Sequence, residues 1–157
     1  GIMLAGAVST YIHRYGVLPG RNAMLFTNNN AAWRTAFDLH DAGCAVAAIV
    51  DVRAAIEPDL RRCASERGIP VFANSVVDGT LGRKRLARVK IRLLMNDSEV
   101  ADTDLEIACD LLAVSGGLSP NVALFAQSRG KLRYDPTIAA FRPGQSWQTS
   151  APWCATW

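Results

Sequence analysis

The sequence predicts an α/β fold in which a parallel sheet is joined to an antiparallel meander of three strands. Three observations support this fold class. Short apolar runs alternate with segments of helical periodicity in the first half of the chain, as in parallel sheets. From residue 76 the helical periodicity stops and three strand-like segments follow one another. A later apolar segment, which ends in Gly116 and Gly117, returns to the first pattern.

The first half of the chain is expected to form the parallel part. Apolar spacing predicts a helix over 3–15, which stops at Gly16 before a turn at Pro19-Gly20. The apolar run Ala45–Val50 has the length of a strand that is buried on both faces. Glycines or a proline mark the ends of the remaining elements: strands at 24–26 and 69–73, and helices at 30–42 and 58–67.

The second half is expected to contain the meander. Its strands are predicted at 76–82, 86–95 and 100–109, with turns at 81–84 and 96–98. Basic residues between 83 and 92 alternate with apolar ones, which favours a half-solvated strand over a nucleic-acid site. A last strand at 110–117 and a short helix at 121–128 complete the pattern.

Bulk composition limits the function classes. The chain has 157 residues, half of them hydrophobic, and a net charge of +3, which argues against a nucleic-acid partner. No apolar run reaches the roughly 20 residues that a membrane helix needs. The four cysteines show no paired spacing, so we expect a cytoplasmic protein without disulfides.

The sequence divides into four parts. Residues 1–20 are expected to form a connecting helix and turn, 21–117 the main α/β domain, and 118–144 a segment that follows it. The chain starts without Met, directly in a helical pattern, so a fragment of a longer protein is expected. Residues 145–157 form an irregular tail, either non-native sequence or a tail that awaits a partner domain.

The segment 23–51 is typical of the opening βαβ unit of a Rossmann-like dinucleotide-binding domain. Counting back from Gly43 in the G-x-G-x-x-G register places Thr27, Asn29 and Ala32 where three glycines are usual. Alanine packs almost as closely as glycine. Thr27 is β-branched and suits a positive φ poorly, and the Asn29 side chain would fill space meant for phosphate oxygens. We therefore expect the turn to form, with an impaired phosphate site.

Two interpretations of the three asparagines stay open. Asn28, Asn29 and Asn30 are suited to capping the following helix. The same residues lie where a helix N-terminus offers free N–H groups to a dinucleotide, so they and Thr27 are candidate cofactor-binding residues. Gly116 and Gly117, at the end of the returning strand, complete this set.

Asp51 is the remaining candidate, about 20 residues beyond the turn, where an acid accepts a hydrogen bond from a ribose hydroxyl. In that role it would favour NAD over NADP, and Arg53 would weaken the preference. The alternative is a helix-start or loop acid. No residues form a recognisable metal site or a nucleophile–base pair, so we predict no catalytic residue and no metal.

Several strings are specific enough to indicate a family. They include Gly-Ile-Met-Leu-Ala-Gly-Ala at 1–7, Tyr-Gly-Val-Leu-Pro-Gly at 15–20, Phe-Thr-Asn-Asn-Asn at 26–30, Ala-Phe-Asp-Leu-His at 36–40, Ala-Ile-Val-Asp at 48–51 and Ala-Val-Ser-Gly-Gly-Leu-Ser-Pro at 113–120. Together they resemble an internal part of the alpha subunit of heterotetrameric sarcosine oxidases. Residues 110–121 also resemble the return segment of pyridine nucleotide–disulfide oxidoreductases.

The resemblance implies that residues 21–117 are an inserted NAD(H)-binding-like domain of a larger FAD/NAD-linked oxidoreductase. It also implies that residues 118–144 are a return segment toward a first nucleotide domain outside this chain. The family oxidises sarcosine to glycine, formaldehyde and hydrogen peroxide, with tetrahydrofolate accepting the one-carbon unit. It further implies an NAD held mainly by an upstream domain, flavins in the full complex, and partners in the same subunit and in other subunits. No position matches a catalytic residue of the family, so the isolated segment is expected to be inactive.

Two other functions stay open. The first is a related amine or amino-acid dehydrogenase subunit, such as an opine or cyanide-forming oxidase, which the flanking domains would distinguish. The second is a non-catalytic interaction module whose nucleotide site is lost, which the residues at Thr27 and Asn29 favour.

Overall fold

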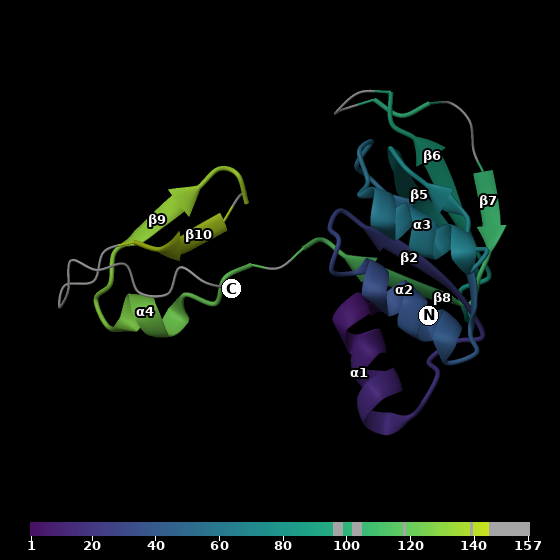
Figure 1. The fold of residues 1–157 in the computed structure, drawn as a ribbon, viewed down its shortest axis with the longest axis horizontal. Helices are drawn as coiled ribbons and strands as arrows, with labels where there is room; N and C mark the ends of the chain where they lie inside the picture. Colours follow the sequence, from purple (N-terminus) through teal and green to yellow (C-terminus); the bar gives the residue numbers. More distant parts are fainter. Residues whose placement is uncertain (96–98, 102–104, 118, 139, 145–157) are drawn as a thin grey trace. The chain divides into compact units, whose positions relative to one another are not determined.

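The computed structural model describes residues 1–157 except 96–98, 102–104, 118, 139 and 145–157 (Figure 1). The chain divides into two compact units, Gly1–Gly117 and Leu118–Trp157. Each unit is described by itself. In the described residues no helix combines the length and the apolar character needed to cross a membrane.

A parallel sheet forms the centre of the first unit. Its strands are β1 (Ile2–Leu4), β2 (Asn22–Thr27), β3 (Ala45–Asp51), β4 (Val71–Phe72) and β8 (Leu111–Ser115), in the order β1-β8-β2-β3-β4. All neighbouring strands in this sheet are parallel. The sheet thus follows the chain from β2 outward to β4, while β8 returns to the other side of β2.

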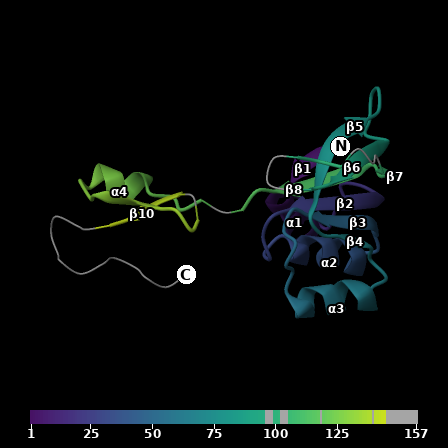
Figure 2. The same cartoon turned by 90° about the horizontal axis from the view of Figure 1, so that it is seen from above.

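Helices cover one face of this sheet and the meander covers the other (Figure 2). The helices are α1 (Ala5–Tyr15), α2 (Trp33–Asp41) and α3 (Pro58–Glu66). The antiparallel meander has the order β5-β6-β7, formed by Ser75–Leu81, Arg88–Leu93 and Leu105–Ala108.

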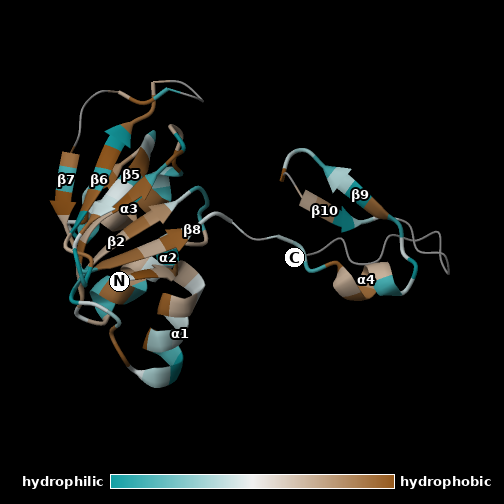
Figure 3. Cartoon of the chain, turned by 180° about the vertical axis from the view of Figure 1, so that it is seen from behind, coloured by the Kyte–Doolittle hydropathy of each residue, from teal (hydrophilic) through white to brown (hydrophobic). Residues whose placement is uncertain are grey.

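Alternating side chains of the central strands fill both interfaces. In β2, Leu25 packs toward the helices with Trp33 and Leu39, because successive strand residues point to opposite faces. Its neighbour Met24 packs toward the meander with Val89 and Ile91. Hydrophobic residues accordingly dominate β2 and β8 of the central sheet (Figure 3). The central sheet is therefore buried on both faces, as the run Ala45–Val50 predicts.

The predicted fold class, a parallel sheet with an antiparallel three-stranded meander, is confirmed. One element is corrected. The helix expected over 3–15 begins at Ala5, because Ile2–Leu4 pairs in parallel with β8 as an edge strand. The predicted turn at 96–98 and the tail at 145–157 lie outside the described residues.

The second unit contains the short helix α4 (Ala123–Gln127) and a hairpin of β9 (Leu132–Asp135) and β10 (Ala140–Pro143). The rings of Tyr134 and Phe141 meet edge to face across the hairpin, with centroids 5.3 Å apart. Arg142 Nε lies 3.0 Å from Asp135 Oδ2 on the same hairpin. The role of this unit as a return segment stays a prediction.

Candidate functional site

The predicted site residues lie at the carboxyl edge of the parallel sheet. Thr27 at the end of β2 is in register with Asp51 at the end of β3 and with Ser115 at the end of β8. The loops that leave these three strands therefore meet at one edge. In open α/β sheets, ligands bind in the crevice outside this edge.

The turn after β2 is closed by its own side chains. Thr27, which is only 2% exposed, accepts hydrogen bonds at Oγ1 from the backbone N–H of Asn29 at 3.1 Å and from its Nδ2 at 3.2 Å. Among the described residues, positive φ outside glycine occurs only at Asn74 and Arg129. The expectation that Thr27 must adopt a positive φ is therefore wrong, because no residue of this turn has a positive φ.

Asn29 makes a hydrogen bond in the turn before α2, although the helix itself, with Ala32 at its N-cap, has no side-chain capping hydrogen bond. Asn29 Oδ1 accepts a hydrogen bond from the backbone N–H of Ala32 at 3.1 Å, ahead of α2. Its Nδ2 donates to Ser115 Oγ at 3.0 Å, which connects the turn to the end of β8. The side-chain amide of Asn29 is thus engaged within the protein.

The other two asparagines bridge to neighbouring loops instead of capping the helix. Asn28 Nδ2 donates to the carbonyl of Gly116 at 3.1 Å. Gly117 follows with φ of +100°, and a Cβ there would lie 3.6 Å from Asn28 Oδ1. Asn30 Nδ2 donates to Glu57 Oε2 at 2.8 Å, across to the loop that follows β3.

Asp51 is fully buried, and both of its carboxylate oxygens are occupied. Oδ2 accepts from Trp33 Nε1 at 2.9 Å and from Arg53 Nη2 at 2.8 Å. Oδ1 accepts from the backbone N–H and the Nε of Arg53, both at 3.0 Å. Asp51 is therefore neither a solvated loop acid nor, in this conformation, an accessible acceptor for a ribose.

The electrostatics of this pair follow from its contacts. Burial alone would raise the pKa of Asp51, but hydrogen bonds from Arg53 and Trp33 outweigh it and lower the pKa below its usual 3.8. The same bond raises the pKa of Arg53. The pair stays ionised, and its bidentate geometry is the strong arrangement for arginine and a carboxylate.

Two residues of this network were not predicted as members of the site. Trp33 lies at the start of α2 and gave only an apolar signal in the sequence. Arg53 was noted for its charge alone, although its Nη1 also donates to Asn30 Oδ1 at 2.7 Å. An acid followed two residues later by arginine is a weak signal for such a local pair.

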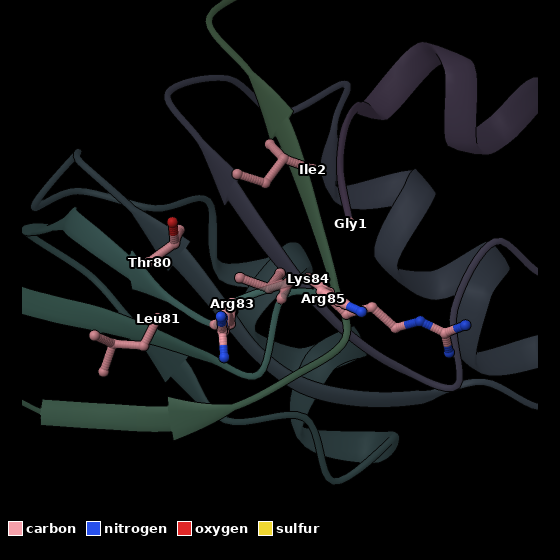
Figure 4. Close-up of a pocket in the computed structure, with 9 residues that line it drawn as sticks. Gly1, Ile2, Thr80, Leu81, Arg83, Lys84 and Arg85 are labelled. Atoms are coloured by element: carbon pink, nitrogen blue, oxygen red, sulfur yellow. The ribbon is translucent and has the colours of Figure 1, made fainter.

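Of two surface pockets in the described residues, one is remote from the Asp51 network and the other includes one of its residues, Asn30. One of about 230 Å³ lies between the start of β1 and the β5–β6 turn, where Gly1 and Ile2 adjoin Arg83, Lys84 and Arg85 (Figure 4). A shallow one of about 620 Å³ lies between α2 and α3 and includes Asn30. Among the described residues, no three His, Cys, Asp or Glu side chains gather to hold a metal ion.

Solved structures with similar folds define the class. Thioredoxin reductase from T. acidophilum aligns with a TM-score of 0.63 at 17% identity, covering 84% of this chain and 40% of that chain. Bacillithiol disulfide reductase from Staphylococcus aureus aligns with a TM-score of 0.58 at 14% identity, covering 82% and 38%. The fold is that of FAD/NAD-linked oxidoreductases of the thioredoxin reductase kind. No family model matches the chain.

Sequence comparison is more specific. The chain is 36% identical over 145 residues to the sarcosine oxidase alpha subunit of Corynebacterium sp. (strain P-1), covering 91% of this chain and 15% of that protein. It is also 36% identical over 141 residues to the corresponding subunit of Rhizobium meliloti (strain 1021), covering 90% and 13%. The predicted resemblance to sarcosine oxidase alpha subunits is confirmed, and the chain spans only about one seventh of these relatives.

Proposed function

We propose that this chain is a segment of an oxidoreductase subunit of the sarcosine oxidase alpha type, in which it forms a dinucleotide-domain scaffold without catalytic residues. The complete protein would oxidise sarcosine to glycine, formaldehyde and hydrogen peroxide. The observation that carries the proposal is the shared carboxyl edge of Thr27, Asp51 and Ser115, together with the identity to the alpha subunits over about nine tenths of the chain.

In this proposal the segment lines a dinucleotide cleft and does not hold NAD by itself. NAD would be held mainly by another domain of the subunit, with flavin elsewhere in the complex. An adenosine ribose does not fit at Asp51 in this conformation, because both carboxylate oxygens already accept hydrogen bonds and the residue is fully buried. We therefore assign no reaction step to a nucleotide at this edge.

The proposed partners are the remaining domains of the same subunit and the other subunits of a hetero-oligomer. The small share of the relatives that this chain spans supports this part of the proposal. The proposed compartment is the reducing cytoplasm, in keeping with the absence of paired cysteine spacing in the sequence.

The test is to sequence the source DNA on both sides and to express the complete reading frame with its neighbouring genes. We expect an upstream G-x-G-x-x-G unit, a downstream folate-type domain, and sarcosine-dependent formation of hydrogen peroxide. A complete protein that oxidises another amine and lacks the folate-type domain would instead indicate a related dehydrogenase. A reading frame confined to this chain would contradict the proposal.

A second candidate is a non-catalytic interaction module whose nucleotide site is lost. The full burial and complete pairing of Asp51 favour it. Complete protein with sarcosine oxidase activity would exclude this candidate. Complete protein with no oxidase activity and no bound dinucleotide would support it over the first.

A further inference from the structure

Asp51 occupies the place where a dinucleotide-binding βαβ unit receives the adenosine ribose. An acid at the end of the second strand of that unit accepts hydrogen bonds from the ribose. It can do so only if lone pairs on its oxygens are free and solvent or ligand can reach them. Asp51 ends β3, the second strand of the unit, and is the acid in that position.

The Arg53 side chain takes the hydrogen bonds that a ribose would need. Its Nε and Nη2 donate to the two oxygens of Asp51 at 3.0 and 2.8 Å, side by side. Two neighbouring ribose hydroxyls would present the same pair of donors to the carboxylate. With the Trp33 indole and the Arg53 backbone N–H, four donors serve about four lone-pair positions.

The same arginine also closes the approach to Asp51. Its Nη1 donates to Asn30 Oδ1 at 2.7 Å, and Asn30 Nδ2 donates in turn to Glu57 Oε2 at 2.8 Å. Asn30 belongs to the turn after β2, and Arg53 and Glu57 belong to the loop after β3. These bonds join the two loops between which an adenosine would have to pass.

We propose that Arg53 is a built-in occupant of the ribose subsite and excludes dinucleotides from Asp51. The inference rests on the proposed role of this edge as a dinucleotide cleft. It assigns Arg53 a role different from that of an arginine that recruits the 2′-phosphate of NADP: its guanidinium is committed to Asp51. A tethered competitor acts at high effective concentration, so a free ribose displaces it poorly.

The first measurement uses the wild-type 157-residue chain labelled with ¹⁵N and titrated with NAD. We expect the Trp33 Nε1–H and Arg53 Nε–H signals to stay unchanged, because NAD does not reach Asp51. Saturable shifts of both signals would overturn the proposal. This measurement decides the question even if an Arg53 variant does not fold.

The second measurement compares the NAD affinity of wild type, Arg53→Ala and the double variant Asp51→Asn/Arg53→Ala by calorimetry. Arg53→Ala should bind NAD at least about tenfold more tightly, the factor of one net charge-assisted hydrogen bond. NADP should gain nothing, because the freed Asp51 repels its 2′-phosphate. The double variant should lose the gain. Arg62→Ala is the control, since Arg62 pairs on the exposed surface of α3 with Asp59 and Glu66.

The NAD titrations of wild type and Arg53→Ala distinguish failure of the Arg53 occupant role from failure of the proposed function. If wild type binds NAD with shifted Arg53 and Trp33 signals and Arg53→Ala gains nothing, the occupant role fails while the cleft stands. If neither protein binds NAD, Arg53 is not the barrier and the occupant role fails, while the proposed function, in which another domain holds NAD, is unaffected. A gain confined to Arg53→Ala supports both.

Discussion

The indole Nε1–H of Trp33 donates to Asp51 Oδ2 over 2.9 Å, and neither side chain is exposed to solvent. Trp33 is the first residue of α2, and Asp51 is the last residue of β3. The bond therefore fixes the start of a helix to the end of a strand at the edge where a ligand would enter. The Arg53 side chain, from the loop after β3, donates two further hydrogen bonds to the same carboxylate.

Removing the charged partner of Asp51 should destabilise the protein strongly. Arg53→Ala leaves a buried carboxylate with too few donors, and we expect the free energy of unfolding to fall by about 3 kcal/mol. Urea denaturation at neutral pH measures it. Arg62→Ala, which breaks only exposed pairs on α3, should leave the free energy of unfolding almost unchanged. Equal losses in the two variants would contradict this account of Asp51.

The Asp51 pair should also appear in the acid stability of the protein. The folded pKa of Asp51 lies below its usual value of 3.8, so its stabilising contribution is full above that value and is lost as the pH falls through the folded pKa. Wild-type melting temperature should therefore fall more steeply than that of Asp51→Asn between about pH 5 and about pH 2. Parallel curves in the two proteins would show that Asp51 is not the source.

The Thr27 hydroxyl should matter more than its size suggests. Thr27→Val keeps the shape but removes the acceptor for the backbone and side-chain N–H groups of Asn29. We expect a loss of about 1–2 kcal/mol in unfolding free energy, measured by urea denaturation. Thr27→Ser keeps the hydroxyl and should lose less. A valine variant as stable as the serine variant would mean that water replaces these bonds.

Restoring the glycines of the phosphate turn should not by itself restore NAD binding. Thr27→Gly/Asn29→Gly empties the loop of side chains but leaves Arg53 on Asp51. We expect the NAD affinity of the double variant to stay near that of wild type and to rise at least about tenfold only when Arg53→Ala is added, as tested by calorimetry on the double and triple variants. High affinity in the double variant would show that the turn, and not Arg53, is the barrier.

Thiol reactivity should separate the described cysteines by burial. Burial, with the nearby Asp110 charge, raises the pKa of Cys109 to about 11, and burial raises that of Cys44. Cys63 is only half-buried. Iodoacetamide at mildly alkaline pH should therefore label Cys63 well before Cys44 and Cys109, as peptide mass mapping would show. Equal labelling of the three in folded protein would contradict the observed burial.

The sequence predicts the buried strands well and the first edge strand poorly. Ala45–Val50 is apolar enough to be recognised as a central strand without reference to its neighbours. Ile2–Leu4 becomes a strand only because β8 returns beside it, from more than a hundred residues away. Local apolar spacing therefore extended α1 back to Met3, two residues too far.

In the candidate site too, the sequence predicts local elements but not contacts between residues that are far apart along the chain. The sequence places Thr27, Asp51 and Gly116 at or after the ends of predicted strands, and the structure brings the ends of these parallel strands to one edge. It does not predict that Trp33 and Asp51, 18 residues apart, are hydrogen-bonded. That contact depends on how α2 packs on β3. Which groups hold NAD in the complete protein stays a prediction.

The bonds within the turn of Thr27 and Asn29 bear on whether this edge needs a ligand in order to fold. A ligand that binds only the folded state adds to its stability, and domains that rely on this effect unfold when the ligand is scarce. In the described residues, every buried side-chain nitrogen and oxygen already has a hydrogen-bond partner. This edge therefore needs no ligand to satisfy its buried polar groups. Under the proposed function, it can take its shape before any cofactor is inserted.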